Sequence, residues 1–199
     1  NALNKLAVSL SAKGDEEAAA KNFAEALLLS PEGEGVEPAI WAAALNNYGS
    51  TLVTLKRLPE AGRIYQKLLL QKRAGMDISP AKIASALNGL GMVYDQLGKL
   101  PKAQDMFERS LAIKEKHLAA DDVALETGRH NLGSIYARLG NVARAAEMAK
   151  LVLASREKRL GKHHPETQDA LLNLQAVAVQ LQRRKSASRE EVEKLMVNV

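Results

Sequence analysis

The sequence contains no cysteine, so a disulfide framework and a thiolate metal site are both excluded. Aromatic residues make up only 4 % of the chain, and no apolar stretch approaches the roughly 20 residues that a membrane-spanning helix needs. Runs of β-branched residues are also absent, whereas the helix formers alanine and leucine are frequent. The composition therefore predicts an all-α protein. A chain without cysteine suits a reducing compartment, so the sequence predicts an intracellular location, either cytoplasmic or organellar.

Charge is distributed unevenly along the 199 residues. Residues 1–50 carry three lysines and seven carboxylates, a net charge of −4, whereas residues 138–189 carry eleven Lys or Arg and four carboxylates, a net charge of +7. An acidic end and a basic end can orient a partner or favour head-to-tail contacts. Ordinary solvated helix faces are the alternative explanation.

An internal repeat of 42 residues runs through the whole chain. The segments that show it begin at residues 1, 43, 85, 127 and 169 and read NALNKLAVSL, AALNNYGSTL, SALNGLGMVY, TGRHNLGSIY and DALLNLQAVA. Aligned positions form a large apolar column, a small-residue column, an alanine column and an aromatic column. These columns are Leu6, Tyr48, Leu90, Leu132 and Leu174; Ala7, Gly49, Gly91 and Gly133; Ala19, Ala61, Ala103, Ala145 and Ala187; and Phe23, Tyr65, Phe107 and then Ala149.

The columns predict a pair of packed helices in each unit. Apolar residues spaced three and four apart form one stripe of a helix, and a glycine on that stripe lets a second helix approach closely. Gly14, Gly98 and Gly140 lie where the first helix is expected to end, because glycine readily adopts the left-handed conformation. The glycines near residue 90 therefore need no phosphate-binding loop, although no column explains Gly89.

Two-helix units with these columns resemble the tetratricopeptide repeat. The family pattern is L-x-x-L-G-x-x-Y, then an alanine nine residues later and an aromatic residue four after that, and residues 87–107 match it fully. The 42-residue period and the G-x-x-H-P linker at residues 161–165 are similar to the kinesin light chain type of repeat. The resemblance implies an all-α, right-handed α-solenoid with four full repeats and a degenerate fifth or capping unit.

We expect one solenoid domain over residues 1–199, with repeats at about 1–36, 37–78, 79–120, 121–162 and 163–199. In the fifth unit Gln175 replaces the small residue. Residues 187–198 are predicted to form a displaced capping helix after the segment RRKSAS, because a shift of one residue restores an apolar stripe of Val192, Leu195, Met196 and Val199. A degenerate terminal repeat suits the end of a solenoid, which needs a polar outer face. Asn1 falls inside the first predicted helix, so we expect the sequence to be a fragment of a longer chain.

The sequence contains no convincing motif for metal binding or catalysis. His163 and His164 precede a proline, but no acidic residue lies at a metal-ligand spacing, so we interpret them as linker residues before a helix. No nucleophile turn or triad is present. The sequence thus predicts no catalytic residue, no metal and no cofactor. Trp41 aligns with Ile83 and Leu125, and we expect it in the core rather than at a ligand.

Polar residues recur on the predicted first helices. The two columns are Asn4, Asn46, Asn88 and His130, and beside them Lys5, Asn47, Gly89, Asn131 and Asn173. In the tetratricopeptide family the first helices line the concave face, and asparagines in such positions often face a bound peptide. The resemblance therefore implies that Asn46, Asn47, Asn88, Asn131 and Asn173 contact a partner. An amide both donates and accepts hydrogen bonds, so it can bind an extended backbone.

Two further observations qualify this site. The asparagine amides could instead join adjacent helices and set the repeat spacing. Arg129, His130 and Arg138 add positive charge to the fourth unit, which favours an acidic ligand or a C-terminal carboxylate.

These features favour a non-catalytic scaffold or adaptor that binds a peptide or a partner protein in its concave groove. A constitutive subunit of a larger complex is the alternative, and large exposed apolar patches would favour it. RNA binding is a third possibility, prompted by a pI of about 9.4. It is disfavoured because position-matched basic residues do not recur along the repeats. We therefore expect a protein or peptide partner, no nucleic acid and no membrane span.

Overall fold

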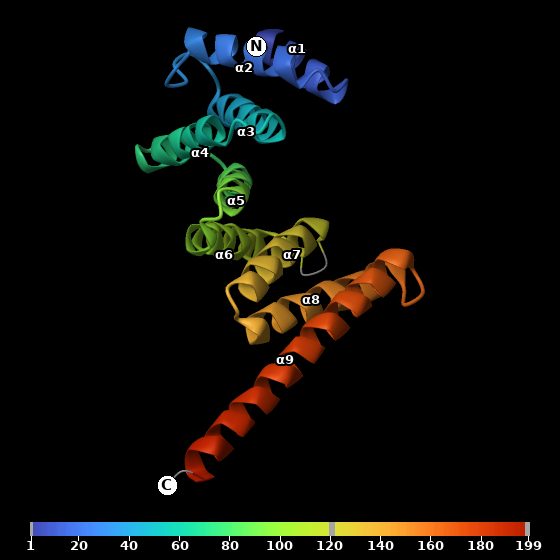
Figure 1. Cartoon of the computed structure of the whole chain (residues 1–199). Coiled ribbons are helices and arrows are strands. Elements are labelled where there is room, and N and C mark those ends of the chain that lie inside the picture. Colours follow the sequence, from blue (N-terminus) through green and yellow to red (C-terminus); the bar gives the residue numbers. More distant parts are fainter. Residues whose placement is uncertain (1, 120–121, 198–199) are drawn as a thin grey trace. The chain divides into compact units, whose positions relative to one another are not determined.

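The computed structural model describes residues 2–119 and 122–197, with side chains described as far as residue 184. All regular elements in these residues are α-helices, and Figure 1 shows how they follow one another. In chain order they are α1 (Ala2–Ala12), α2 (Glu16–Leu29), α3 (Pro38–Thr54), α4 (Leu58–Arg73), α5 (Pro80–Gln96), α6 (Leu100–His117), α7 (Val123–Arg138), α8 (Val142–Leu160) and α9 (Pro165–Val197).

The helix boundaries repeat at the interval that the sequence predicts. The first helices of successive units end at residues 12, 54, 96 and 138, which are 42 residues apart. The second helices begin at residues 16, 58, 100 and 142, with the same spacing. The prediction of an all-α fold built from helix-turn-helix repeats is confirmed.

The turns inside these helix pairs share one hydrogen-bond pattern. After α5, Gly98 has a φ of +70° and the Lys99 N–H donates to the carbonyl of Tyr94 at 2.8 Å. This is a Schellman motif, in which a left-handed residue lets the chain satisfy the last carbonyls of the helix. Gly14 and Gly140 are left-handed in the same place, as predicted. The equivalent residue after α3 is Lys56, whose φ of +59° is unfavourable for a side chain with a Cβ atom.

Contacts divide the chain into two compact units, residues 1–117 and 118–199. In the first unit, α1 and α2, α3 and α4, and α5 and α6 form three helix pairs, and α3 packs on both α2 and α5. The alanine and aromatic columns of this unit are buried between the paired helices. Trp41 is also buried, and its Nε1–H donates to the carbonyl of Ser30 at 3.2 Å. Its predicted place in the core is confirmed.

The large apolar column is buried in the middle of the chain and less so at its ends. Tyr48, Leu90 and Leu132 are buried, whereas Leu174 is half-buried. Leu6 is 50 % exposed, because it lies on a face of α1 that no described helix covers. In the first unit the stripe predicted from periodicity is therefore a core in α3 and α5, which both pack on several neighbouring helices.

In the second unit, α8 packs on both α7 and α9. Helix α9 runs without interruption from Pro165 to Val197, so the predicted separate capping helix at residues 187–198 is wrong. The segment RRKSAS contains neither glycine nor proline, and its residues can all continue a helix. The side chain of Ala187, the last member of the alanine column, lies outside the described residues.

Candidate partner-binding site

An open cavity of about 300 Å³ lies between α7, α8 and α9 in the second unit. Four of the residues predicted to contact a partner line it: Arg129, His130 and Arg138 from α7, and Asn173 from α9. Arg129 is buried, whereas the other three are exposed. The structure therefore brings together side chains that are as far as 44 residues apart in the sequence.

Small residues make up part of the lining of this cavity, together with Val152 and Val177. Gly133 and Ala137 come from α7, Ala145 and Ala149 from α8, and Ala176 from α9. No carboxylate is present among the described residues that line the cavity. A space that is lined by small apolar residues and has the arginine Arg138 exposed at its opening suits a peptide that carries an apolar side chain and negative charge.

The fourth repeat lacks the aromatic residue that the first three repeats carry. In the second and third repeats the aromatic ring lies directly over the small residue: a Cβ atom on Gly49 would lie 2.6 Å from Cζ of Tyr65, and one on Gly91 would lie 2.8 Å from the ring of Phe107. In the fourth repeat Ala149 replaces the ring, although Gly133 keeps the small position. Met148 lies against this glycine instead, since a Cβ atom on Gly133 would be 3.2 Å from Cβ of Met148.

A buried carboxylate fastens α7 to α8 in the same unit. Glu126 on α7 accepts hydrogen bonds from Ser155 Oγ at 2.8 Å, Arg156 Nε at 3.2 Å and Arg159 Nη2 at 3.1 Å, all on α8. Burial alone would raise the pKa of the Glu126 carboxyl, but the hydrogen bonds from Ser155, Arg159 and Arg156 outweigh it, so its pKa lies below the usual value. Glu126 thus stays charged at neutral pH.

Sequence reasoning missed Glu126, although a signal was present. The aligned positions hold Ala42 and Ala84, which are both buried. A carboxylate in a column of buried alanines must be paired, because an isolated buried charge is strongly unfavourable. Arginines one helix later, in the segment REKR, supply the partners.

The remaining predicted residues lie elsewhere. The Asn46 amide donates from Nδ2 to the carbonyl of Lys82 at 3.0 Å, which joins α3 to α5 and fits the helix-spacing alternative. Asn47 is exposed and lines another cavity of about 300 Å³, together with residues of α1 and α2. Asn88 Nδ2 contacts Met92 Sδ of its own helix at 3.7 Å, and Asn131 is half-buried on α7. The asparagine columns therefore do not form one uniform site.

His164 contacts the start of the helix that follows it. Nδ1 of His164 accepts a hydrogen bond from the Glu166 N–H at 3.3 Å, in the first turn of α9. Among residues 2–119 and 122–197, no group of three or more His, Asp or Glu side chains could hold a metal ion. Within the same residues, no helix combines the length and the apolar character that crossing a bilayer requires.

Sequence comparison identifies the repeat. Family models of the tetratricopeptide repeat match residues 1–32, 42–116 and 127–166. The chain belongs to the tetratricopeptide repeat family. No curated protein sequence matches it. Two-helix tetratricopeptide units account for the helix pairs α1–α2, α3–α4, α5–α6 and α7–α8.

Several solved structures share this tetratricopeptide fold. The putative kinesin light chain with nearly identical TPR-like repeats from Podosopora anserina has a TM-score of 0.76 at 17 % identity, covering 94 % of this chain and 89 % of that one. BtubC (BKLC) from P. vanneervenii has a TM-score of 0.75 at 22 % identity, covering 98 % and 80 %. A MamA RS-1 double mutant has a TM-score of 0.62 at 19 % identity, covering 79 % and 75 %. The predicted resemblance to kinesin light chain-like repeats is confirmed at the level of the fold.

Proposed function

We propose that this tetratricopeptide chain is a non-catalytic interaction module that binds an acidic peptide segment of a partner protein in the cavity between α7, α8 and α9. The convergence of Arg129, His130, Arg138 and Asn173 on one open cavity supports this function. In this proposal residues 1–199 act as one repeat domain in an intracellular, cytoplasmic or organellar, setting.

The cavity offers each part of such a peptide a complementary group. Arg138 and His130 are exposed at the opening, where they attract carboxylates. The amide of Asn173 can donate to and accept from a peptide backbone. An apolar side chain of the partner would enter the space beside Ala149, where other repeats hold their own aromatic ring. Asn46 has a structural role in this proposal, because its amide already joins two helices.

Selection from a random peptide library on the immobilised 199-residue chain tests this function. We expect acidic sequences to be enriched, and their affinity to fall about tenfold or more for Arg138→Glu. Ala149→Phe should also block binding, because the new ring fills the cavity. Asn47→Ala is the matched control, since it lies in the first unit and lines a different cavity.

The same variants can contradict the proposal. If Ala149→Phe folds with an unchanged melting temperature and still binds the selected peptides as tightly as the wild type, the cavity is not the binding site. Enrichment of peptides without acidic residues would contradict the charge argument.

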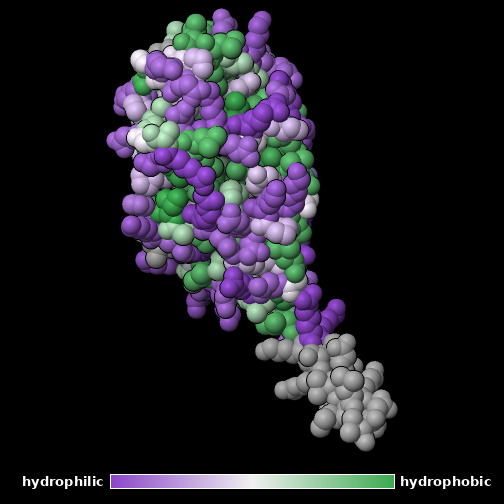
Figure 2. Space-filling model, turned by 90° about the vertical axis from the view of Figure 1, so that its left-hand side faces the viewer, coloured by the Kyte–Doolittle hydropathy of each residue, from purple (hydrophilic) through white to green (hydrophobic). Residues whose placement is uncertain are grey.

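The alternative function is a constitutive subunit of a larger complex. It is favoured by large apolar side chains at the surface, above all Leu28 and Leu29 on α2, which are 78 % and 74 % exposed. Figure 2 shows apolar residues interspersed with hydrophilic ones on one face of the molecule. Copurification of a partner that high salt and competing acidic peptides do not release would support this alternative.

A further inference from the structure

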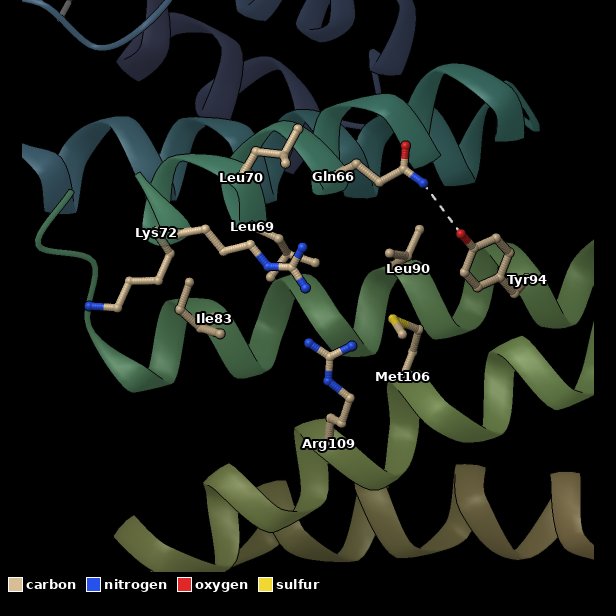
Figure 3. Close-up of a pocket in the computed structure, with 10 residues that line it drawn as sticks. Gln66, Leu69, Leu70, Lys72, Ile83, Leu90, Tyr94, Met106 and Arg109 are labelled. Carbon is tan, nitrogen blue, oxygen red and sulfur yellow. Dashed lines mark hydrogen bonds between the residues drawn. The ribbon is translucent and has the colours of Figure 1, made fainter. Parts of the chain in front are cut away.

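A cavity of about 350 Å³ lies between α4, α5 and α6 in the first unit. None of the residues predicted to contact a partner lines it. Its apolar lining includes Leu69 on α4, Ile83 and Leu90 on α5, and Met106 on α6. Figure 3 shows these side chains between the three helices, with the hydrogen bond from Gln66 to the Tyr94 hydroxyl (3.3 Å) at one end. We call it the α4–α6 cavity.

The opening of the α4–α6 cavity carries positive charge. Lys72 and Arg73 end α4, and Arg109 reaches from α6 into the opening (Figure 3). All three are exposed, and no carboxylate lines the cavity among the described residues. Arg109 has an ion pair with the exposed Asp105 at 3.5 Å, whereas Lys72 and Arg73 have no ion-pair partner in the described part of the chain. An apolar floor with a cationic opening suits aliphatic side chains next to carboxylates.

The chain itself presents a segment with this chemistry. Leu28 and Leu29 lie at the end of α2 and are among the most exposed large apolar side chains. Glu25 precedes them by one turn of α2. Glu34 lies in the loop that follows α2, where its carboxylate accepts a hydrogen bond from the Glu32 N–H at 3.3 Å. Both glutamates are exposed. We call these four residues the acidic leucine patch. Because the patch is exposed and the α4–α6 cavity is open, the two are not joined within one molecule.

We propose that the α4–α6 cavity binds the acidic leucine patch of a second copy of this chain. Leu28 and Leu29 of one copy cover the apolar floor of the other, and Glu25 and Glu34 pair with the cations at its opening. The two surfaces are different, so the contact is heterologous. This proposal goes beyond the proposed function and uses no residue of the cavity between α7, α8 and α9.

A charge-exchange experiment tests it. Sedimentation velocity over a range of concentrations should show that the wild-type chain self-associates. The cavity variant Arg73→Glu/Arg109→Glu and the patch variant Glu25→Arg/Glu34→Arg should each weaken self-association about tenfold or more, because like charges then face each other. An equimolar mixture of the two variants should associate again, since the reversed cavity of one fits the reversed patch of the other.

Lys116→Glu is the matched control, because it reverses an exposed charge on α6 that does not line the cavity. Circular dichroism should show the same helicity for all variants. A wild-type chain that stays monomeric at every concentration would overturn the proposal, and so would a mixture that fails to associate. If the cavity variant instead loses binding to an acidic peptide of another protein while the wild type stays monomeric, that partner and not a second copy occupies the cavity.

Discussion

Tyr65 is the side chain that sets the distances between three helices. Its ring is buried on α4, with Gly49 of α3 and Gly89 of α5 against it. Burial raises the pKa of Tyr65 to about 12, so the phenol stays neutral at physiological pH. Glycine at position 89 is therefore required by the ring of the preceding repeat, a contact to which the repeat alignment gave no clue.

Substitution of Gly89 by alanine should destabilise the protein by about 2 kcal/mol, because overpacking forces a ring or a helix to move. The new Cβ atom would lie 2.2 Å from Cζ of Tyr65 and 2.6 Å from its hydroxyl oxygen. Gly62→Ala is the matched control, since its Cβ atom would have no neighbour closer than 3.7 Å. That change should stabilise helix α4 by roughly 0.5–1 kcal/mol. Urea unfolding measures both, and equal effects would contradict the role of Tyr65.

Single residues explain why part of the site could be predicted and part could not. Arg129, His130 and Arg138 were found because basic residues cluster on one predicted helix, and Asn173 because it aligns with asparagines of earlier repeats. The cavity that unites them is lined by Ala149, which the alignment showed only as an exception to the aromatic column. The hydrogen bond of Asn46 to Lys82 fits the predicted helix-spacing alternative, but its acceptor could not be predicted, because it depends on the separation of α3 and α5.

At the level of helices, boundaries were predictable wherever glycine ends a helix. The 42-residue period predicted the positions of the turns after α1, α3, α5 and α7. This includes the turn after α3, where Lys56 takes the place of glycine. The length of α9 was not predicted, because the expected turn rested on a shift of the apolar stripe and not on a helix-ending residue. A change in hydrophobic register alone is therefore weak evidence for a break.

The pairing of α7 with α8 should depend on Glu126. Replacing it with glutamine should lower the free energy of unfolding by about 2 kcal/mol at neutral pH, since charged hydrogen bonds are lost and arginines lose their partner. Glu157→Gln on the exposed side of α8 is the control and should have little effect.

The pH dependence gives a second measurement of the same network. Because the folded pKa of Glu126 lies below its usual value, its contribution is fully present above about pH 4.3 and is lost as the pH falls through the folded pKa. The difference between wild type and Glu126→Gln should therefore shrink as the pH falls toward about 3. A difference that stays constant with pH would show that the carboxylate charge is not what stabilises the pair.

For the whole molecule, charge is the property through which both proposed associations can be tested. The chain has a formal net charge of +5, yet residues 1–50 carry −4. Acidic peptides bound near Arg138 and copies joined through the acidic leucine patch should both dissociate more readily at high salt, because screening shortens the range of the attraction. Titration from about 50 to 500 mM NaCl measures this dependence. Affinities that do not change with salt would show that apolar contacts dominate instead.

The ring of Tyr65 also restricts how such a chain can evolve. At the position of Gly89, the second, fourth and fifth repeats carry Asn47, Asn131 and Asn173. A gene rearrangement that placed any of these repeats after the tyrosine would push an asparagine side chain into the space of the phenol. Modules that look alike in an alignment are therefore not interchangeable, and duplication or shuffling of this array requires a compensating change at one of two positions.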